Sequence, residues 1–350
     1  MFFASDNTSP VHPTVMDALS KANDGYAMPY GNDPIMDEVR AMIRDRFEAP
    51  EAAVYLTATG TSANCTALAC LTPPWATIFC HTNAHIEEDE CGAPEFYTGG
   101  SKLTLVGGDH ARMDAKALDH AISHTARGGV HNIQRGAVSI TSPTENGAVY
   151  SMAQIEDIAR IAKNYELPVH MDGARFANAL VATNASPAEM TWKAGIDAVT
   201  LGGTKNGLMG VEAVILFDPK HSWEFELRRK RAGHLFSKHR YLSAQMQAYL
   251  KDDLWLEMAR HANTMAAQLS RGILSIDAAS LLHPTEANSV FAHIPRGAHR
   301  RAHEAGAKYY LWPFDQTLEG DPDEGLSSRM VCSWCTKDED IVQLISALKG

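Results

Sequence analysis

The sequence predicts an α/β protein with a large domain, built on a mostly parallel β-sheet flanked by helices, and a smaller C-terminal α+β domain. Short apolar runs alternate with segments of helical periodicity up to about residue 245, as parallel strands joined by helices require. Beyond that point the sequence pattern predicts longer helical segments and a few strands near the C-terminus. A chain of 350 residues is long enough for two domains, expected over 1–245 and 246–350.

The first half of the chain carries four short strand candidates, at 53–56, 77–80, 103–106 and 138–141. After the first of them, a turn leads into a helical run over 63–71, which Pro73 and Pro74 end. The strand over 138–141 runs into the polar turn 142–147.

The clearest local prediction is a helix over about 152–165. Ser151 and Gln154 form a capping box, apolar residues follow at helical spacing, and Pro168 stops the helix. Further strands are expected over 169–171, 198–201 and 211–217. In the C-terminal part we expect a helix over 251–274, strands over 289–294 and 330–333, and a solvated, mobile loop over 317–328.

Composition and charge favour a globular protein that acts on a small molecule. A net charge of −11 argues against a nucleic-acid-binding surface. Neither a secretory signal nor about 18 consecutive apolar residues occur, so no membrane association is expected. Six scattered cysteines lack a disulfide framework, which favours the cytoplasm, and the lone pair Cys332 and Cys335 does not predict a metal site.

A basic cluster stands out in this acidic chain: Arg228, Arg229, Lys230, Arg231, Lys238 and Arg240. Two interpretations stay open for it. The cluster is either a solvated helix face or a group that neutralises an anion at a subunit interface.

Ligands of open α/β sheets bind at the carboxyl ends of strands, and the turn Thr59-Gly60-Thr61 follows one. Free N–H groups at a helix start, together with small hydroxyl side chains, form a phosphate site. The same turn is also a common helix cap.

Asp172 ends another predicted strand. A buried carboxylate needs a cation, and a protonated pyridine nitrogen is one such partner. The alternative partner within the sequence is Arg175, with which Asp172 would close a helix N-terminus.

Lys205 lies between glycines and small polar residues after the strand over 198–201. A lysine that forms a Schiff base needs access and close backbone approach, which this turn offers. An isolated lysine in such a turn would otherwise be a solvated loop residue.

The order of these features, a phosphate turn, a strand-end Asp and a strand-end Lys, resembles that of the fold-type-I pyridoxal-phosphate enzymes. Within them, the chain resembles the low-specificity L-threonine aldolases and phenylserine aldolases from residue 5 to about residue 334. The motifs that carry the resemblance are Ser5-Asp6-Asn7, Tyr30-Gly31-Asn32-Asp33-Pro34, Thr59-Gly60-Thr61-Ser62-Ala63-Asn64, Ala84-His85, Met171-Asp172-Gly173-Ala174-Arg175 and Gly203-Thr204-Lys205-Asn206-Gly207.

The resemblance implies a role for each matching residue. Lys205 would bind the aldehyde of pyridoxal 5′-phosphate, Asp172 would meet its ring nitrogen, and His85 would stack on the ring or act as the base. Thr59, Gly60 and Thr61 would hold the phosphate, and Arg175 would lie near the cofactor's phenolic oxygen and the substrate carboxylate. Ser5 and Arg329 would bind that carboxylate. Tyr30 and part of the basic cluster would reach across from a neighbouring subunit.

One position departs from the family pattern. Many members carry a histidine in a Thr-His-Asn-Gly turn, whereas this chain has Glu145 in Thr144-Glu145-Asn146-Gly147. Glu145 is therefore a candidate for the substrate site, and the assignment of the catalytic base stays open.

The resemblance implies a lyase that cleaves L-β-hydroxy-α-amino acids such as threonine, allo-threonine or phenylserine to glycine and an aldehyde, and catalyses the reverse synthesis. It also implies a homotetramer, a dimer of dimers with active sites at the dimer interfaces, and requires no metal. The nearest alternative is another reaction on the same scaffold: β-elimination, transamination or racemisation. A remote alternative is a non-catalytic α/β binding protein.

Overall fold

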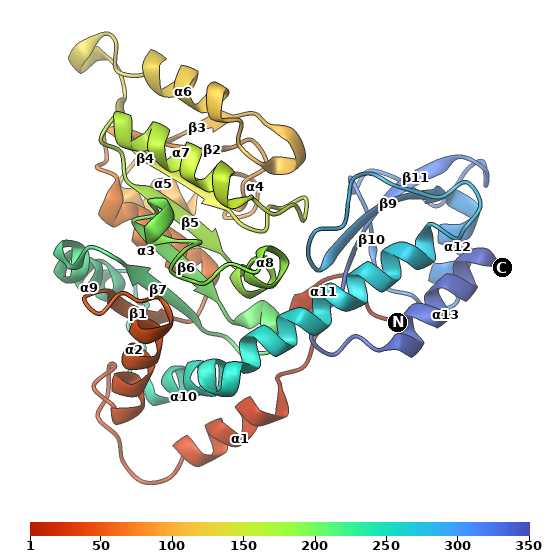
Figure 1. The fold of residues 1–350 in the computed structure, drawn as a ribbon, viewed down its shortest axis with the longest axis horizontal. Coiled ribbons are helices and arrows are strands. Elements are labelled where there is room, and N and C mark those ends of the chain that lie inside the picture. Colours follow the sequence, from red (N-terminus) through yellow and green to blue (C-terminus); the bar gives the residue numbers. More distant parts are fainter.

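A seven-stranded sheet forms the centre of the larger part of the molecule in the computed structural model, which describes all 350 residues (Figure 1). The strands are β1 (Ala53–Thr57), β2 (Ala76–His81), β3 (Lys102–Val106), β4 (Gln134–Thr141), β5 (Val169–Gly173), β6 (Ala198–Gly202) and β7 (Glu212–Leu216), in the order β1-β7-β6-β5-β4-β2-β3. Each lies where the sequence predicts a strand. The prediction of a mostly parallel sheet is confirmed.

Only β7 runs against its neighbours. It pairs antiparallel with both β6 and β1, while the other neighbouring pairs are parallel. The connection from β6 to β7 covers only residues 203–211, too short for the crossover that a parallel strand needs. The chain therefore turns back at Lys205 and places β7 beside the turn it has just made.

Helices cover both faces of the sheet. They are α1 (Pro13–Ala22), α2 (Pro34–Arg46), α3 (Gly60–Leu71), α4 (His85–Glu88), α5 (Ala93–Thr98), α6 (Ala115–His124), α7 (Met152–Asn164), α8 (Phe176–Thr183), α9 (Ser222–Arg231) and α10 (Arg240–Leu250). The predicted capping box of α7 is confirmed: Gln154 N–H donates to Ser151 Oγ and the Gln154 side chain accepts from the Ser151 N–H.

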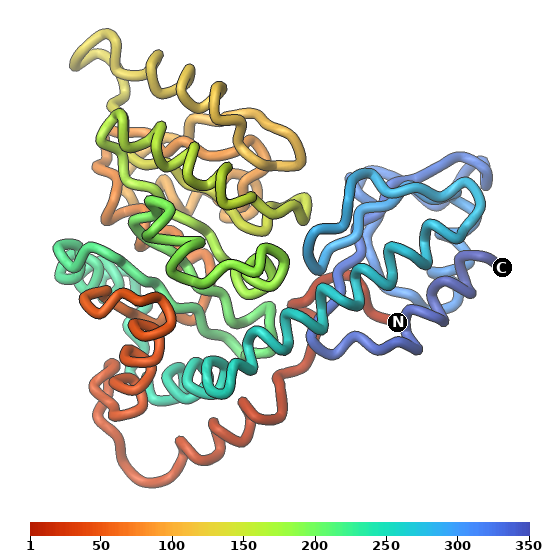
Figure 2. The backbone as a smooth tube through the Cα atoms, viewed as in Figure 1, coloured from red at the N-terminus to blue at the C-terminus, as the bar shows by residue number.

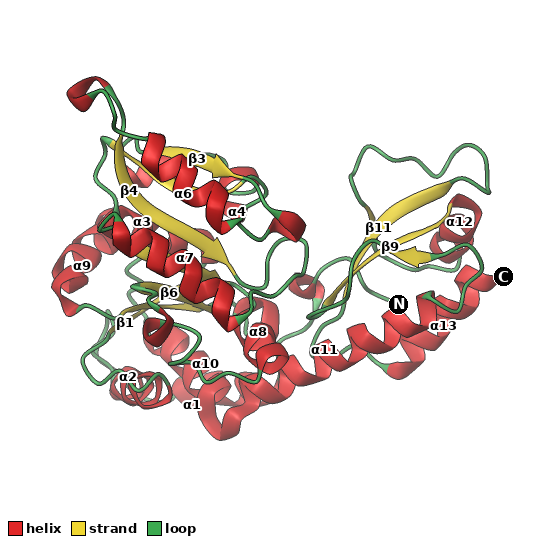
Figure 3. Cartoon of the chain, turned by 45° about the horizontal axis from the view of Figure 1, so that its top comes forward, coloured by secondary structure: helices red, strands yellow, loops and turns green.

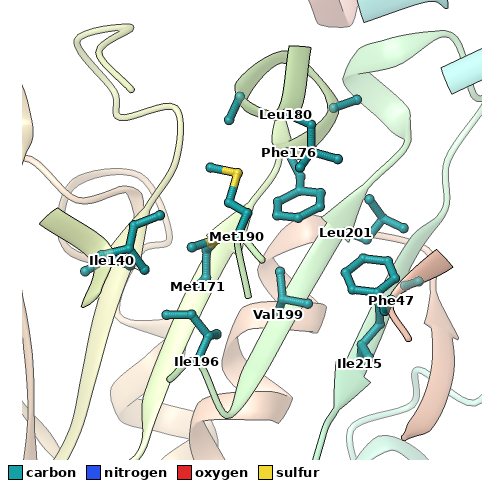
Figure 4. Close-up of a cluster of buried hydrophobic side chains, with 14 of the residues drawn as sticks. Phe47, Ile140, Met171, Phe176, Leu180, Met190, Ile196, Val199, Leu201 and Ile215 are labelled. Carbon is teal, nitrogen blue, oxygen red and sulfur yellow. The ribbon is translucent and has the colours of Figure 1, made fainter. Parts of the chain in front are cut away.

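Alternate residues of the strands face two separate cores. Val54 and Leu56 of β1 belong to the main core, which contains residues of α2, α7, α8 and α10. Ala53 and Tyr55 face the other way, toward α3 and α9. Figure 4 shows part of the main core, where the rings of Phe47 and Phe176 stack with centroids 5.8 Å apart. A sheet buried on both faces leaves only its strand ends for ligands.

The smaller part of the molecule contains a four-stranded antiparallel sheet, in agreement with the predicted α+β character. Its strands are β8 (Ser280–Leu281), β9 (Ser289–Pro295), β10 (Tyr310–Leu311) and β11 (Gly325–Val331), in the order β10-β11-β9-β8. The helices α11 (Leu254–Ile273), α12 (Arg296–Glu304) and α13 (Asp338–Lys349) pack with it, and α11 runs from the large part to the small one (Figure 3).

The sequence placed the strand of β11 too late. A solvated loop was expected up to residue 328, but β11 begins at Gly325 and pairs with β9 along its whole length. Its alternate residues Leu326, Ser328 and Met330 are buried. The polar composition of the segment gives no sign of this burial. The rest of the loop is tied down, because Arg296 donates to the carbonyls of Thr317 and Asp321.

The N-terminal segment joins the two parts. Phe3 is buried in the core of the smaller part, where its N–H donates to Lys308 O and its carbonyl accepts from Val331 N–H. Figure 2 shows the red N-terminal segment passing beside the blue C-terminal segments before it continues to α1. The domain boundary at residue 245 stays a prediction. It assigns Phe3 to the large domain, whereas Phe3 packs in the core of the smaller part.

None of the helices is both long enough and apolar enough to cross a membrane. All six cysteines are free thiols, and Cys332 is buried directly after β11.

Candidate active site

A cavity of about 220 Å³ opens at strand ends of the large sheet. Six of the predicted site residues line it, from the turns after β1, β5 and β6 and from the start of α4. The lining consists of Asn7, Ala58, Thr59, Gly60, Thr61, Asn64, His85, Asp172, Ala174, Thr204, Lys205 and Glu212. Groups separated by up to two hundred residues in the chain thus meet where parallel strands end.

The turn after β1 is a helix cap, and its role as an anion site stays a prediction that its free N–H groups support. Thr59 is the N-cap of α3, and its hydroxyl accepts from the Ser62 N–H at 3.1 Å. Gly60 and Thr61 follow as the first two helical residues, whose N–H groups have no acceptor within the helix. No atom lies within 4 Å of where a side chain at Gly60 would begin, so a phosphate has room there.

Asp172 is almost fully buried at the end of β5. One carboxylate oxygen accepts from the Ala174 N–H at 2.9 Å, and the other accepts from the Asn64 side-chain amide at 2.9 Å. No Asp172–Arg175 pair exists, so that alternative is wrong. Asp172 is already bound by neutral donors, and Arg175 instead meets Asp6, which the N-terminal segment brings to it.

His85 begins α4 and is held by a buried carboxylate. Its Nδ1 lies 2.8 Å from Glu90 Oε1, and the Asn64 amide also donates to that oxygen at 3.1 Å. The hydrogen bond to Glu90 raises the pKa of His85, and the charge of Asp172 adds to the increase, although burial opposes it. Asn64 therefore joins two carboxylates, Glu90 and Asp172, next to the imidazole. These hydrogen bonds explain why His85, Glu90 and Asp172 lie within metal-ligand range of one another.

Lys205 lies in a short 3₁₀ turn, Thr204–Asn206, that is anchored on both sides. The Gly203 N–H donates to Glu212 Oε2 at 2.7 Å on one side. On the other, the Tyr249 hydroxyl donates to Gly202 O at 3.0 Å and accepts from the Asn206 amide at 2.9 Å. The turn closes at a glycine with φ of 91°, Gly207, where a Cβ would lie 2.8 Å from a methionine sulfur. The backbone that carries the Lys205 amine is thus tightly fixed.

The two arginines named in the sequence analysis differ in their partners. Arg175 makes a bidentate ion pair with Asp6, with distances of 2.6 and 2.9 Å. Arg329 has no carboxylate partner: its guanidinium lies 4.7 Å from the Trp312 ring, and its buried Nε has no hydrogen-bond acceptor. Burial and the neighbouring Arg175 lower the pKa of Arg329, while Glu145 and Asp6 oppose this. A carboxylate would complete this set of donors.

Five predicted residues do not line the cavity: Ser5, Tyr30, Glu145, Arg175 and Arg329. Ser5 caps the short 3₁₀ helix Asp6–Thr8 through the Asn7 N–H, and Glu145 is half-buried and adds to the raised pKa of His85. Tyr30 is exposed, beside Lys230 of the basic cluster, whose Nζ lies 5.2 Å from the Tyr30 ring. A role for Tyr30 in a neighbouring subunit's site stays a prediction.

Several residues that build the site had no role predicted from the sequence. Asn64 and Asn7 belong to motifs of the family resemblance, but they act with residues of distant segments. Glu90 lies in a stretch of acidic residues, a composition that is typical of a solvated turn, so its burial could not be recognised from the sequence. Glu212 left a usable signal, because it is the one charged residue in an otherwise apolar strand.

The cavity suits pyridoxal phosphate. A carboxylate, a lysine amine, an imidazole and a helix start with free N–H groups are the partners that its ring nitrogen, aldehyde, ring face and phosphate need. The Thr204 hydroxyl also lines the cavity, where its side chain lowers the pKa of Glu212 as a hydrogen-bond donor.

Comparisons with known proteins agree with this chemistry. Residues 3–296 match the family model of the beta-eliminating lyases. The chain is 36% identical to the low specificity L-threonine aldolase of a Pseudomonas species over 348 residues, which cover 99% of this chain and 97% of that protein. It is 37% identical to the low specificity L-threonine aldolase of Pseudomonas aeruginosa, covering 98% and 95% of the two chains. The structure of Leishmania major threonine aldolase superposes with a TM-score of 0.91 at 25% identity, covering 99% and 98%.

Proposed function

The chain belongs to the beta-eliminating lyase family, and we propose that it is a pyridoxal-phosphate-dependent aldolase acting on L-β-hydroxy-α-amino acids. It would cleave their Cα–Cβ bond to give glycine and an aldehyde, and catalyse the reverse synthesis. One observation carries this proposal. Lys205, Asp172, His85 and the Thr59-Gly60-Thr61 turn line a single cavity. Arg329, outside this lining, is an arginine that lacks a carboxylate partner.

The cofactor would be held at three points. Lys205 would bind its aldehyde covalently, Asp172 would pair with the ring nitrogen, and the start of α3 at Gly60 and Thr61 would bind the phosphate. When bound, pyridoxal phosphate supplies an electron-withdrawing ring that takes up the electron pair of a bond broken at Cα. The Asn64 and Ala174 donors fix both oxygens of Asp172, the carboxylate that would meet the ring nitrogen.

The substrate carboxylate would bind mainly at Arg329. Arg175 has its Nε–H and one Nη2–H engaged by Asp6, which leaves the two Nη1 hydrogens and the second Nη2 hydrogen for the cofactor or the substrate. Arg329 is held by ring contacts instead, which leaves its hydrogen-bond donors free for a bidentate contact. Fixing the carboxylate at Arg329 would set which bond at Cα is oriented for cleavage.

His85 is our candidate for the group that accepts the β-hydroxyl proton, directly or through water. Its Nδ1 is engaged by Glu90, so Nε2 is the nitrogen left to exchange a proton. A carboxylate partner strengthens an imidazole as a base, as the raised pKa of His85 reflects. Stacking on the cofactor ring is compatible with the same position of His85.

Glu145 would act on the aldehyde side of the substrate, in place of the histidine that many family members carry. We further propose that aromatic substrates such as phenylserine are accepted beside threonine and allo-threonine.

The assembly would be a homotetramer with sites completed by Tyr30 and the basic cluster of a neighbouring subunit. The six free thiols favour a cytoplasmic location.

The decisive experiment incubates the purified protein with pyridoxal phosphate and each stereoisomer of threonine and phenylserine. Equal amounts of glycine and aldehyde would support the proposal. Ammonia with a keto acid, a keto acid alone, or an inverted amino acid would instead indicate β-elimination, transamination or racemisation. A protein that stays colourless and inert with added cofactor would contradict any such enzyme and favour a binding protein.

A further inference from the structure

Glu212 is a buried carboxylate beside Lys205 for which the proposed reaction has no use. It begins β7, where it lies opposite Gly202 of β6 and Thr57 of β1, and it is only 5% exposed. The rest of β7 is apolar. Its side chain lines the same cavity as Lys205 and Asp172. Burying a carboxylate costs free energy, and an apolar residue at this position of β7 would avoid that cost. The carboxylate at position 212 therefore indicates a function.

The contacts of Glu212 point to the Lys205 turn. Its Oε2 accepts a hydrogen bond from the Gly203 N–H at 2.7 Å, two residues before Lys205. It forms no direct ion pair with an arginine or a lysine, and Lys205 is the cation that acts on it electrostatically. The antiparallel return of β7 brings the carboxylate there directly, since Glu212 pairs with Gly202 at the base of the turn.

Holding the turn does not by itself require a charge. On its other side, the neutral Tyr249 and Asn206 side chains anchor the same backbone, and neither lines the cavity. Among the side chains that anchor the turn, only Glu212 also lines the cavity and carries a carboxyl group. The charge therefore has a role beyond that of the hydrogen bond.

We propose that Glu212 is a positioning residue for Lys205, fixing its turn through Gly203 and serving as the buried counter-charge of its amine. The inference rests on the proposed function, in which Lys205 bonds to the cofactor aldehyde. An ionised Glu212 stabilises the ammonium form of Lys205, which cannot attack a carbonyl. When the substrate amine replaces Lys205 on the cofactor, the released lysine is thus held back from competing with it.

The charge of Glu212 changes within the working pH range. Burial raises the pKa of Glu212 to about 7, and the charge of Asp172 adds to the increase, although the Thr204 hydroxyl, the Gly203 N–H and Lys205 oppose it. The groups that face it are Lys205 and Thr204 on the turn, Asp172 on β5, Thr57 on β1 and Tyr249 on α10. Below pH 7 the carboxyl is mostly neutral, and above pH 7 it is mostly an anion.

The test follows cofactor capture by the full-length apoprotein. Mixing it with pyridoxal phosphate forms a carbon–nitrogen double bond to Lys205 and releases water, and the initial rate is read from the visible absorbance. Glu212→Gln keeps an acceptor for Gly203 but removes the charge. The ratio of its rate to the wild-type rate should rise from near one at pH 5.5 to about tenfold at pH 8.5, because removing a nearby opposite charge frees the neutral amine.

Tyr249→Phe is the matched control. It removes the neutral anchor of the same turn without changing any charge near Lys205. Its rate relative to wild type should therefore be the same at every pH. A flat ratio for Glu212→Gln as well would overturn the inference. The ionisation of the cofactor itself cancels in each ratio.

A second variant covers the case in which Glu212→Gln does not fold. Glu212→Asp retains the charge on a shorter arm, and should keep the wild-type pH profile of capture even if its rate is lower throughout. Loss of that profile in Glu212→Asp would also overturn the inference. If the wild-type protein itself captures no cofactor, the proposed function fails first, so the two failures are distinguishable.

Discussion

Asp6 accepts two hydrogen bonds from Arg175, at 2.6 and 2.9 Å, across 169 positions of the sequence. The pair is buried, and the charge and hydrogen bond of Arg175 keep the pKa of Asp6 low against the effect of burial. Asp6 Oδ2 also accepts from the Asn288 amide, which in turn donates to Cys332 O. The N-terminal segment thereby links Arg175 of the large part to the smaller part that carries Arg329.

Asp6→Asn should destabilise the protein and weaken substrate binding. The change keeps the shape but leaves the Arg175 guanidinium buried without its anion, which costs about 3–5 kcal/mol of unfolding free energy. Urea unfolding measures this loss, and KM should rise because Arg175 and the link to the smaller part lose their fixed geometry. The control is Asp157→Asn, which breaks the exposed pair with Arg160 and should change stability by less than about 1 kcal/mol. Equal effects of the two variants would contradict the role of Asp6.

Lys205→Ala should lose the visible absorbance of the bound cofactor and nearly all turnover. The alanine cannot bond to the aldehyde, and no other lysine lines the cavity. Absorbance spectra and glycine release measure both effects. Lys193→Ala, which removes a surface lysine paired with Glu48, should retain both. If Lys205→Ala stayed yellow and active, the whole site assignment would be wrong.

Glu90→Gln should shift the pH dependence of the reaction toward lower pH. The hydrogen bond to Glu90 is the main cause of the raised pKa of His85, so removing its charge lowers that pKa and frees the neutral imidazole at lower pH. A base must be neutral to accept a proton, so the acidic limb of kcat against pH should move down. An unchanged limb would argue that His85 does not transfer the proton.

His85→Asn separates proton transfer from stacking. If His85 is the base, kcat falls by about 10²- to 10⁴-fold while the cofactor spectrum is retained. If its role is stacking alone, retro-aldol turnover stays intact in a variant that still binds the cofactor. Comparison with Glu90→Gln at a pH where both variants are folded shows whether the two residues act as one unit.

Residues at strand ends could be predicted from the sequence, and residues brought in from elsewhere could not. Asp172, Lys205 and the Thr59 turn each follow an apolar strand directly, so local pattern and the parallel sheet together place them at one edge. Asp6 and Glu90 depend on burial and on partners in distant segments, which periodicity does not contain, whereas Glu212 is marked in the sequence as the one charged residue of an apolar strand. The Asp172–Arg175 alternative failed for the same reason, because only the folded chain brings Asp6 to Arg175.

Trp312→Leu should weaken substrate binding without affecting cofactor capture. Trp312 lies under the Arg329 guanidinium at 4.7 Å and Tyr310 lies at 6.0 Å, so the ring is the main contact that orients this arginine. Loss of the cation–π contact costs about 1–2 kcal/mol, which corresponds to a rise in KM of roughly 5- to 30-fold. Trp312→Phe keeps an aromatic face and should lie close to wild type. Trp312 does not line the cavity that contains Lys205. The visible absorbance and the rate of cofactor capture should therefore be those of wild type in both variants. A loss of absorbance in Trp312→Leu would mean that the ring supports the fold rather than Arg329.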